Sequence, residues 1–171
     1  MENFADLYSD YLISSSSYAT STGMANLLSI KHDKITRELS NGDYDSKFLW
    51  KQSKVYVKEL TQSKELITLS FDDSIEEKRY TDESELHCWH FDHTFGKSVR
   101  GVNFLTALIE VGTMRLPCAV EFVKKDLWKK DPKTGKEKRK SSVSKNELFR
   151  KMLRECNGKF RFDYVLADSW Y

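Results

Sequence analysis

The sequence has few cysteines, and no pattern suggests a structural role for them. Cys88, Cys118 and Cys156 are odd in number and widely spaced, and no CxxC pair occurs. These features argue against a disulfide framework or a cysteine-rich zinc knuckle, and they fit a reducing cytoplasm. Cys118 falls within a predicted strand, where we expect it to be a small core residue.

The sequence also lacks a strong net charge and a long apolar run. Lys and Arg number 28 against 26 Asp and Glu, so the net charge of +2 says nothing about nucleic acid. The longest apolar stretch, 102–111, is interrupted by polar residues and is too short to span a bilayer. The first residues do not resemble a signal peptide. We therefore expect a cytoplasmic protein without a membrane partner.

What is present begins with helical periodicity in residues 1–60. The first apolar residues recur at the spacing of one buried helix face: Phe4, Leu7, Tyr8, Tyr11 and Leu12. Short helices are predicted around 24–28 and 32–39, and Asn41-Gly42 is a helix-stop signal. A further helix is predicted over about 47–60. This part of the chain is expected to be a small all-α region.

From residue 61 onward the pattern becomes strand-like. Apolar, β-branched segments predict strands at 66–73, 102–111, 114–124 and 160–167, and Gly112-Thr113 predicts a hairpin turn between the second and third. An amphipathic helix is predicted over 146–156, and 124–145 reads as a polar, basic connection. The order of three strands, a helix and a strand is typical of an α/β domain.

Two of these strands end on carboxylates, at Asp72-Asp73 and at Asp168. Acidic residues at the ends of neighbouring strands can make an oxygen-rich site suited to Mg²⁺ or Mn²⁺. Strand alternation places Asp72 on the polar face with Thr68 and Ser70, so Asp72 is the preferred ligand and Asp73 a supporting or turn-capping residue. The alternative is an ordinary turn, because Asp-Asp-Ser after a strand is a frequent turn sequence.

The acidic segments resemble a known family. The segment LITLSFDDSIEEKRYTDESELHCWHFDHTFGKSVRGVNFLTALI, residues 66–109, is similar to the first catalytic block of IS4-type insertion-sequence transposases. FDYVLADSWY, residues 162–171, resembles the block around their second aspartate, and TGMANLLSIKHDKITREL resembles their helix-turn-helix region.

The resemblance implies an RNase H-like core with a DDE triad that binds two divalent metals, Mg²⁺ or Mn²⁺, and cuts and transfers DNA ends. Asp72 matches the first aspartate and Asp168 the second. The family's glutamate lies in a later Tyr-x2-Arg-x3-Glu-x6-Lys pattern, and no Glu follows Asp168 here. The expectation is therefore an N-terminal transposase fragment with an incomplete RNase H-like mixed sheet and a flanking helix. We expect it to be catalytically inactive alone.

Two basic segments are candidate DNA contacts. A helix-turn-helix would direct Lys31, His32, Lys34 and Arg37 to the major groove and phosphates. The alternative is an ordinary helical bundle with a solvated basic face. Residues 124–145 hold ten Lys and Arg against three acidic residues, and a run of this kind can neutralise phosphates or remain a mobile solvated loop. Its candidate contacts are Lys129, Lys130, Arg139 and Lys140.

A histidine-rich segment is a second candidate metal site. His87, Cys88, His90 and His93 match no standard zinc spacing. In an extended segment His87 and His93 would be roughly 20 Å apart, too far to share one ion. Packing and hydrogen bonding are the expected roles.

The expected organisation is a helix-turn-helix-like DNA-binding region over 1–60 and the first part of a DDE catalytic domain over 61–171. The partner expected is double-stranded DNA at element terminal repeats, with full-length transposase or a second copy as further candidates. The setting would be the bacterial or archaeal nucleoid. Two alternatives stay open: a binding module that occupies element ends or inhibits full-length transposase, and a remnant that folds poorly because a core strand is missing.

Overall fold

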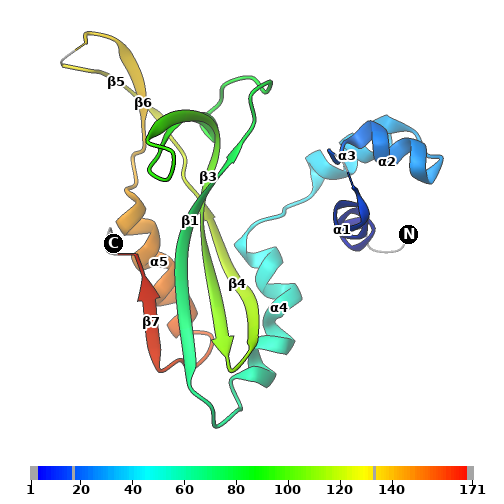
Figure 1. Cartoon of the computed structure of the whole chain (residues 1–171), viewed down its shortest axis with the longest axis vertical. Coiled ribbons are helices and arrows are strands. Elements are labelled where there is room, and N and C mark those ends of the chain that lie inside the picture. Colours follow the sequence, from blue (N-terminus) through cyan, green and yellow to red (C-terminus); the bar gives the residue numbers. More distant parts are fainter. Residues whose placement is uncertain (1–3, 17, 133, 169–171) are drawn as a thin grey trace. The chain divides into compact units, whose positions relative to one another are not determined.

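The computed structural model describes residues 4–16, 18–132 and 134–168. The chain separates into two compact units, with the division after Asp43 (Figure 1). The boundary expected from the sequence lay near residue 60. Helix α4 (Ser46–Leu60) instead packs against the sheet of the second unit, because its inner face carries the buried Val57 and the half-buried Trp50.

The first unit contains α1 (Phe4–Ser14), α2 (Ser21–Leu28) and α3 (His32–Asn41). Its centre is formed by Met24, Ala25 and Ile35, all buried. Apolar side chains from the three helices and the α2–α3 turn surround that centre: Phe4, Leu7, Tyr8, Tyr11, Leu28, Ile30 and Leu39. The helical periodicity therefore marked the side chains that pack together.

Hydrogen bonds cap both ends of α2, and the turn from α2 to α3 is short. The Thr20 hydroxyl accepts a hydrogen bond from Gly23 N at 2.9 Å and caps the start of α2. At the other end Ser29 is left-handed, with a φ of 54°, and its N–H bonds back to carbonyl groups of α2. Only three residues, 29–31, separate the two helices.

The second unit is built on a mixed sheet. Strand β3 (Lys97–Val111) is its centre and pairs antiparallel with β1 (Ile67–Glu77) along one edge. The other edge of β3 pairs with β2 (His87–Asp92) and then with β4 (Met114–Phe122), both antiparallel. On the far side of β1 lies β7 (Tyr164–Ala167), which runs parallel to it. This mixed α/β arrangement agrees with the RNase H-like fold class expected from the sequence.

One face of this sheet carries the core. Alternate residues of β1 and β3 are buried, as two-residue periodicity requires. Helices α4 and α5 (Lys145–Asn157) both contribute to the same cluster, through Val57 and through Met152. Phe71 of β1 meets Phe149 of α5 edge to face at 4.7 Å. The remaining buried members are Ile67, Leu69, Leu105, Ala107, Ile109, Val111, Cys118, Ala119, Val123, Cys156 and Phe160.

The strands differ from the prediction in their lengths. Strand β1 does not end at the Asp pair but continues to Glu77, paired with β3 as far as Gly101. Strand β2 was not predicted, and β3 begins five residues earlier than expected. The outer part of β1 is mostly exposed and acidic, and the buried positions of β2 are His87, Cys88 and His90, so neither segment shows an alternation of aliphatic residues.

The basic segment after β4 is ordered rather than a plain connection. Strands β5 (Leu127–Lys130) and β6 (Glu137–Lys140) form an antiparallel hairpin that extends away from the sheet (Figure 1). Trp128 lies opposite Arg139, whose guanidinium stacks 4.4 Å from the indole ring. This cation–π pair explains how so polar a segment holds strand structure. Within the described ranges, no helix combines the length and apolar character that crossing a bilayer requires.

Candidate active site

The register of β7 against β1 is set by Asp163. Its Oδ2 accepts a hydrogen bond from Ile67 N at 2.9 Å, and its own N–H donates to Ile67 O at 2.8 Å. From this pair of hydrogen bonds the two strands run parallel, and Phe71 lies opposite Ala167. Asp72 and Asp168 are the next residues along each strand. Both strands extend by the same number of residues from this pair of hydrogen bonds. Asp72 and Asp168, 96 positions apart in the sequence, therefore occupy adjacent strand positions.

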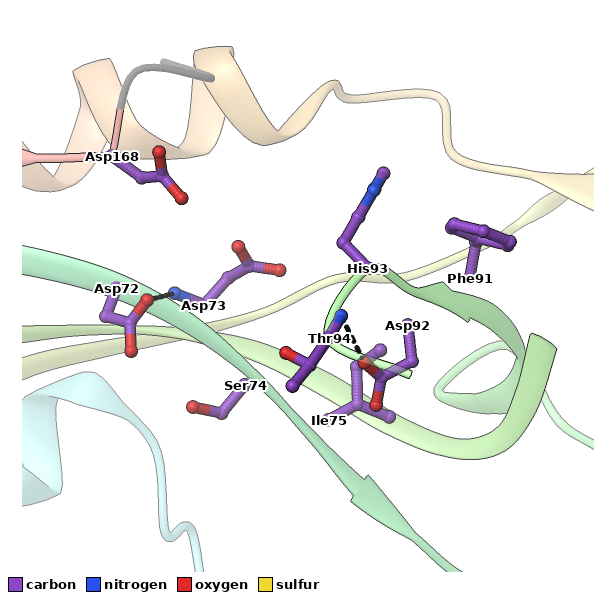
Figure 2. A pocket seen from close by; sticks show the side chains of 9 residues that line it. All are labelled: Asp72, Asp73, Ser74, Ile75, Phe91, Asp92, His93, Thr94 and Asp168. Atoms are coloured by element: carbon purple, nitrogen blue, oxygen red, sulfur yellow. Dashed lines mark hydrogen bonds between the residues drawn. The ribbon is translucent and has the colours of Figure 1, made fainter. Parts of the chain in front are cut away.

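A pocket of about 420 Å³ opens at this point (Figure 2). Asp72, Asp73 and Asp168 line one side of it, and Asp92 and His93 from the β2–β3 turn line the other. The other lining residues are Ser74, Ile75, Phe91 and Thr94. Carboxylate oxygens gathered in this way are the ligand type that hard divalent cations prefer.

The neighbouring aspartates Asp72 and Asp73 extend to opposite sides of β1. Asp72 is exposed, and its Oδ1 accepts a hydrogen bond from Asp73 N at 2.9 Å. Asp73 is half-buried and extends to the side on which Asp168 and His93 lie (Figure 2). Lys145, the first residue of α5, forms an ion pair with the Asp73 carboxylate, and Asn103 Nδ2 lies 3.5 Å from it. Lys145 thus balances the charge of Asp73, which lies within β1 and not in a turn.

The donor chemistry suits Mg²⁺ or Mn²⁺, since these ions prefer carboxylate oxygen and keep several water ligands. Asp168 and the two aspartates of β1 are the carboxylates that this pocket offers to such an ion. Of the two on β1, Asp73 extends to the side of Asp168 and is paired with Lys145, whereas Asp72, the ligand expected from the sequence, extends to the other side (Figure 2). Among the residues that the structure describes, no three His, Cys, Asp or Glu side chains are arranged around one ion position.

Sequence reasoning missed the opposite wall of this pocket. Asp92 Oδ1 accepts hydrogen bonds from Thr94 N at 2.9 Å and Phe95 N at 3.2 Å, and so closes the β2–β3 turn. Gly96, with a φ of 61°, completes the turn. The signal was present in the sequence as an aromatic run followed by a short Gly-containing segment, a pattern typical of a hairpin.

The histidine-rich segment is placed as its packing role predicts. His87 is buried, with Nδ1 2.9 Å from Asp82 O and Nε2 2.6 Å from Lys78 O, and it ties down the β1–β2 connection. His90 is also buried, and its Nε2 lies 3.4 Å from Cys88 Sγ. Burial lowers the pKa of His90 to about 4, assisted by the positive charges of Lys125 and Lys145 and by His87.

The cysteines lie in the interior. Cys88, Cys118 and Cys156 are all buried and unpaired as disulfides. Cys118 is in β4, fully buried as the sequence predicted, and its thiol donates to Ala107 O at 3.3 Å. Burial raises the pKa of the Cys88 thiol. Buried thiols of this kind serve packing.

The basic residues of the first unit are accessible. Lys31, His32, Lys34 and Arg37 are exposed at the start and along α3. Lys31, Lys34 and Arg37 line one hollow together with two acidic residues, Asp33 and Glu38. Three of the four predicted recognition residues thus line one hollow of mixed charge, and His32 is not among its lining residues.

The basic residues of the β5–β6 hairpin are less uniform. Lys129, Lys130 and Lys140 are exposed. Arg139 instead donates to Glu83 at 3.0 Å and stacks on Trp128. Its guanidinium is engaged within the protein, so it fixes the hairpin more than it offers a free charge to a ligand.

Comparison with known proteins gives one match. A family model described as DDE superfamily endonuclease matches residues 2–171. No curated protein and no solved structure matches the chain.

Proposed function

Because that family model covers nearly its whole length, the chain belongs to the DDE superfamily endonucleases, and from this premise we propose that it is a DNA transposase. Its reaction would be divalent-metal-dependent cleavage at element ends followed by strand transfer. The family implies a DNA substrate. The assignment to the IS4 type rests on the resemblance of the two aspartate blocks.

The observation that carries the proposal is the pairing of β7 with β1. Parallel pairing up to Phe71 and Ala167 makes Asp72 and Asp168 the next residue along each strand, and both line the acidic pocket. Convergence of carboxylates from adjacent strands is the arrangement that metal-dependent phosphodiester chemistry needs.

Each residue has a distinct role in this proposal. Asp72 and Asp168 hold Mg²⁺ or Mn²⁺, which when bound would activate a water or hydroxyl and stabilise the leaving oxygen. Asp73, paired with Lys145, fixes the end of α5 against β1 and limits the negative charge of the pocket. Lys129, Lys130 and Lys140 hold DNA phosphates near the site.

The first unit would recognise the element ends. The α2–turn–α3 geometry and the exposed Lys31, His32, Lys34 and Arg37 support major-groove binding. The acidic neighbours Asp33 and Glu38 would exclude phosphates from part of this face and so help to fix its orientation.

Metal binding tests the proposal without requiring turnover. We expect Mn²⁺ binding, followed by calorimetry or electron paramagnetic resonance, to weaken at least about tenfold in Asp72→Asn and in Asp168→Asn. Asp92→Asn is the matched control, because Asp92 lines the same pocket from the opposite wall. Unchanged binding in both ligand variants would overturn the assignment, and a larger loss in Asp73→Asn than in Asp72→Asn would transfer the ligand role to Asp73.

A second candidate function is end binding without cleavage. The observation that favours it is that no third ligand joins Asp72 and Asp168 within the described ranges. Such a protein would occupy terminal repeats or inhibit a complete transposase. Mn²⁺-dependent nicking of an element end, lost in Asp72→Asn, would exclude this candidate; end-specific binding with no nicking would support it.

A further inference from the structure

A second pocket lies between β2 and the β5–β6 hairpin. Its volume is about 640 Å³, and two tryptophans, Trp89 and Trp128, line it together with Lys125, Lys138 and Arg139. Glu83, Ser98 and Glu137 complete the lining. Trp89 is 55% exposed and Trp128 is 56% exposed. Two large indole rings left open to solvent in one pocket are unusual, since a tryptophan ordinarily buries most of its surface.

Contacts within the protein hold this pocket in shape. Arg139 stacks on Trp128 and donates to Glu83 at 3.0 Å, and Lys125 Nζ donates to Trp89 O. The hairpin is thereby attached to the segment before β2 and to β2 itself. Trp128 has one ring face occupied by the guanidinium, and the pocket is accessible to a second flat group.

Side chains of β2 line both this pocket and the acidic pocket. Phe91 is two residues after Trp89, so both side chains extend from the same side of the strand. Phe91 is 53% exposed and lines the acidic pocket. Same-side residues of a strand are about 6.8 Å apart, which is about twice the rise per nucleotide of a stacked DNA strand. An unstacked strand could therefore place successive bases on Phe91 and Trp89.

We propose that Trp89 and Trp128 form a stacking site for unpaired nucleobases of the DNA strand whose phosphodiester lies in the acidic pocket. This inference rests on the proposed function for the identity of the ligand as DNA. It adds that the strand is single-stranded beside the cut site.

The chemistry of the pocket favours a nucleic acid over an acidic peptide. Exposed indole rings bind flat bases of any sequence, while lysines along the hairpin neutralise the backbone. Residues 124–145 carry ten Lys and Arg against three acidic residues. Glu83 and Glu137 lie within the pocket itself and would repel carboxylate side chains placed there. Bases can occupy the pocket between the two indole rings while the phosphates contact the lysines of the hairpin.

The test compares single-stranded and duplex DNA of equal length in EDTA, so that metal binding plays no part. A fluorescently labelled twelve-nucleotide thymidine oligomer is titrated with the full chain and followed by anisotropy. Trp89→Ala and Trp128→Ala are each expected to weaken single-strand binding roughly 5- to 150-fold, and duplex binding less than about twofold. Tyr80→Ala is the control, because Tyr80 is 99% exposed and outside the pocket.

The outcomes separate this inference from the proposed function. Equal loss on both DNA forms, or no loss in either tryptophan variant, overturns the stacking site. Equal competition by a poly-glutamate peptide of matched charge also overturns it. Selective single-strand loss that persists in Asp72→Asn supports it, even where the metal assignment fails. Thermal unfolding of Trp128→Ala, with Trp128→Phe as a variant that keeps an aromatic ring, distinguishes loss of stacking from loss of fold.

Discussion

Asp163 and Ile67 are bonded in both directions, side chain to backbone and backbone to backbone, across 96 positions of sequence. Every later residue of β7 takes its partner on β1 from this anchor. The location of Asp168 is therefore a consequence of a contact made five residues earlier.

Removing the Asp163 carboxylate tests this anchor. Asp163→Ala should lower the free energy of unfolding by about 1–2 kcal/mol, since the partly buried Ile67 N–H loses its acceptor. Hydrogen exchange should show faster exchange at the Ile67 amide. Asp163→Asn keeps an acceptor oxygen and should stay close to wild type. Full protection of Ile67 in the alanine variant would contradict the anchor.

Close approach of two strands makes Gly101 intolerant of a side chain. A Cβ at Gly101 would lie 2.2 Å from Glu76 O, a backbone atom that moves only if β1 moves. Gly101→Ala should therefore cost about 1–3 kcal/mol of stability. At Gly158 a Cβ would meet its nearest neighbour at 3.6 Å, so Gly158→Ala serves as the control and should be neutral or slightly stabilising. Denaturant unfolding measures both, and equal effects would refute the steric argument.

The start of α5 depends on a capping box. Ser144 Oγ accepts from Glu147 N at 3.3 Å, and the Glu147 carboxylate accepts from Ser144 N at 2.8 Å. Ser144→Ala should lower stability by about 1 kcal/mol, and Ser144→Asp should retain most of it. The bonds from Ser144 lower the pKa of Glu147, so the difference between wild type and Ser144→Ala should shrink as acid protonates Glu147. A stability difference between wild type and Ser144→Ala that stays constant down to acid pH would contradict a contribution from the capping box.

His90 should make stability depend on pH. Its pKa is lowered to about 4 in the folded protein, against about 6.5 in the unfolded chain. The unfolded chain therefore takes up the proton first as pH falls, and stability is lost between about pH 6.5 and 4. The loss should approach about 3 kcal/mol.

The check on His90 is the difference between variants, since carboxylates titrate in the lower part of the same window. His90→Gln should flatten the pH dependence of unfolding between about 6.5 and 4.5, whereas His93→Gln, at an exposed position, should retain it. Parallel pH profiles for wild type and His90→Gln would rule out His90 as the source.

Much of the fold could be predicted because burial leaves a periodic trace. The helical spacing of Phe4, Leu7, Tyr8 and Tyr11 predicted α1, and the alternation of Ile67, Leu69 and Phe71 predicted the inner part of β1. Strands with few aliphatic side chains leave no such trace. Strand β2 and the hairpin of β5 and β6 are held by backbone hydrogen bonds between strands and by pairs such as Trp128–Arg139. These interactions cannot be predicted until the partner strand is known.

The sequence by itself determined which residue types are available for chemistry: aspartates after apolar strands, basic residues on a short helix, and buried cysteines. Only the tertiary structure decided which of them meet. Residues distant along the chain become neighbours through strand register, and register depends on long-range bonds such as Asp163–Ile67. No local sequence pattern encodes which strand a side chain will face. The sequence therefore did not predict that Asp92, His93 and Phe91 line the acidic pocket, or that Trp89 and Trp128 line one pocket.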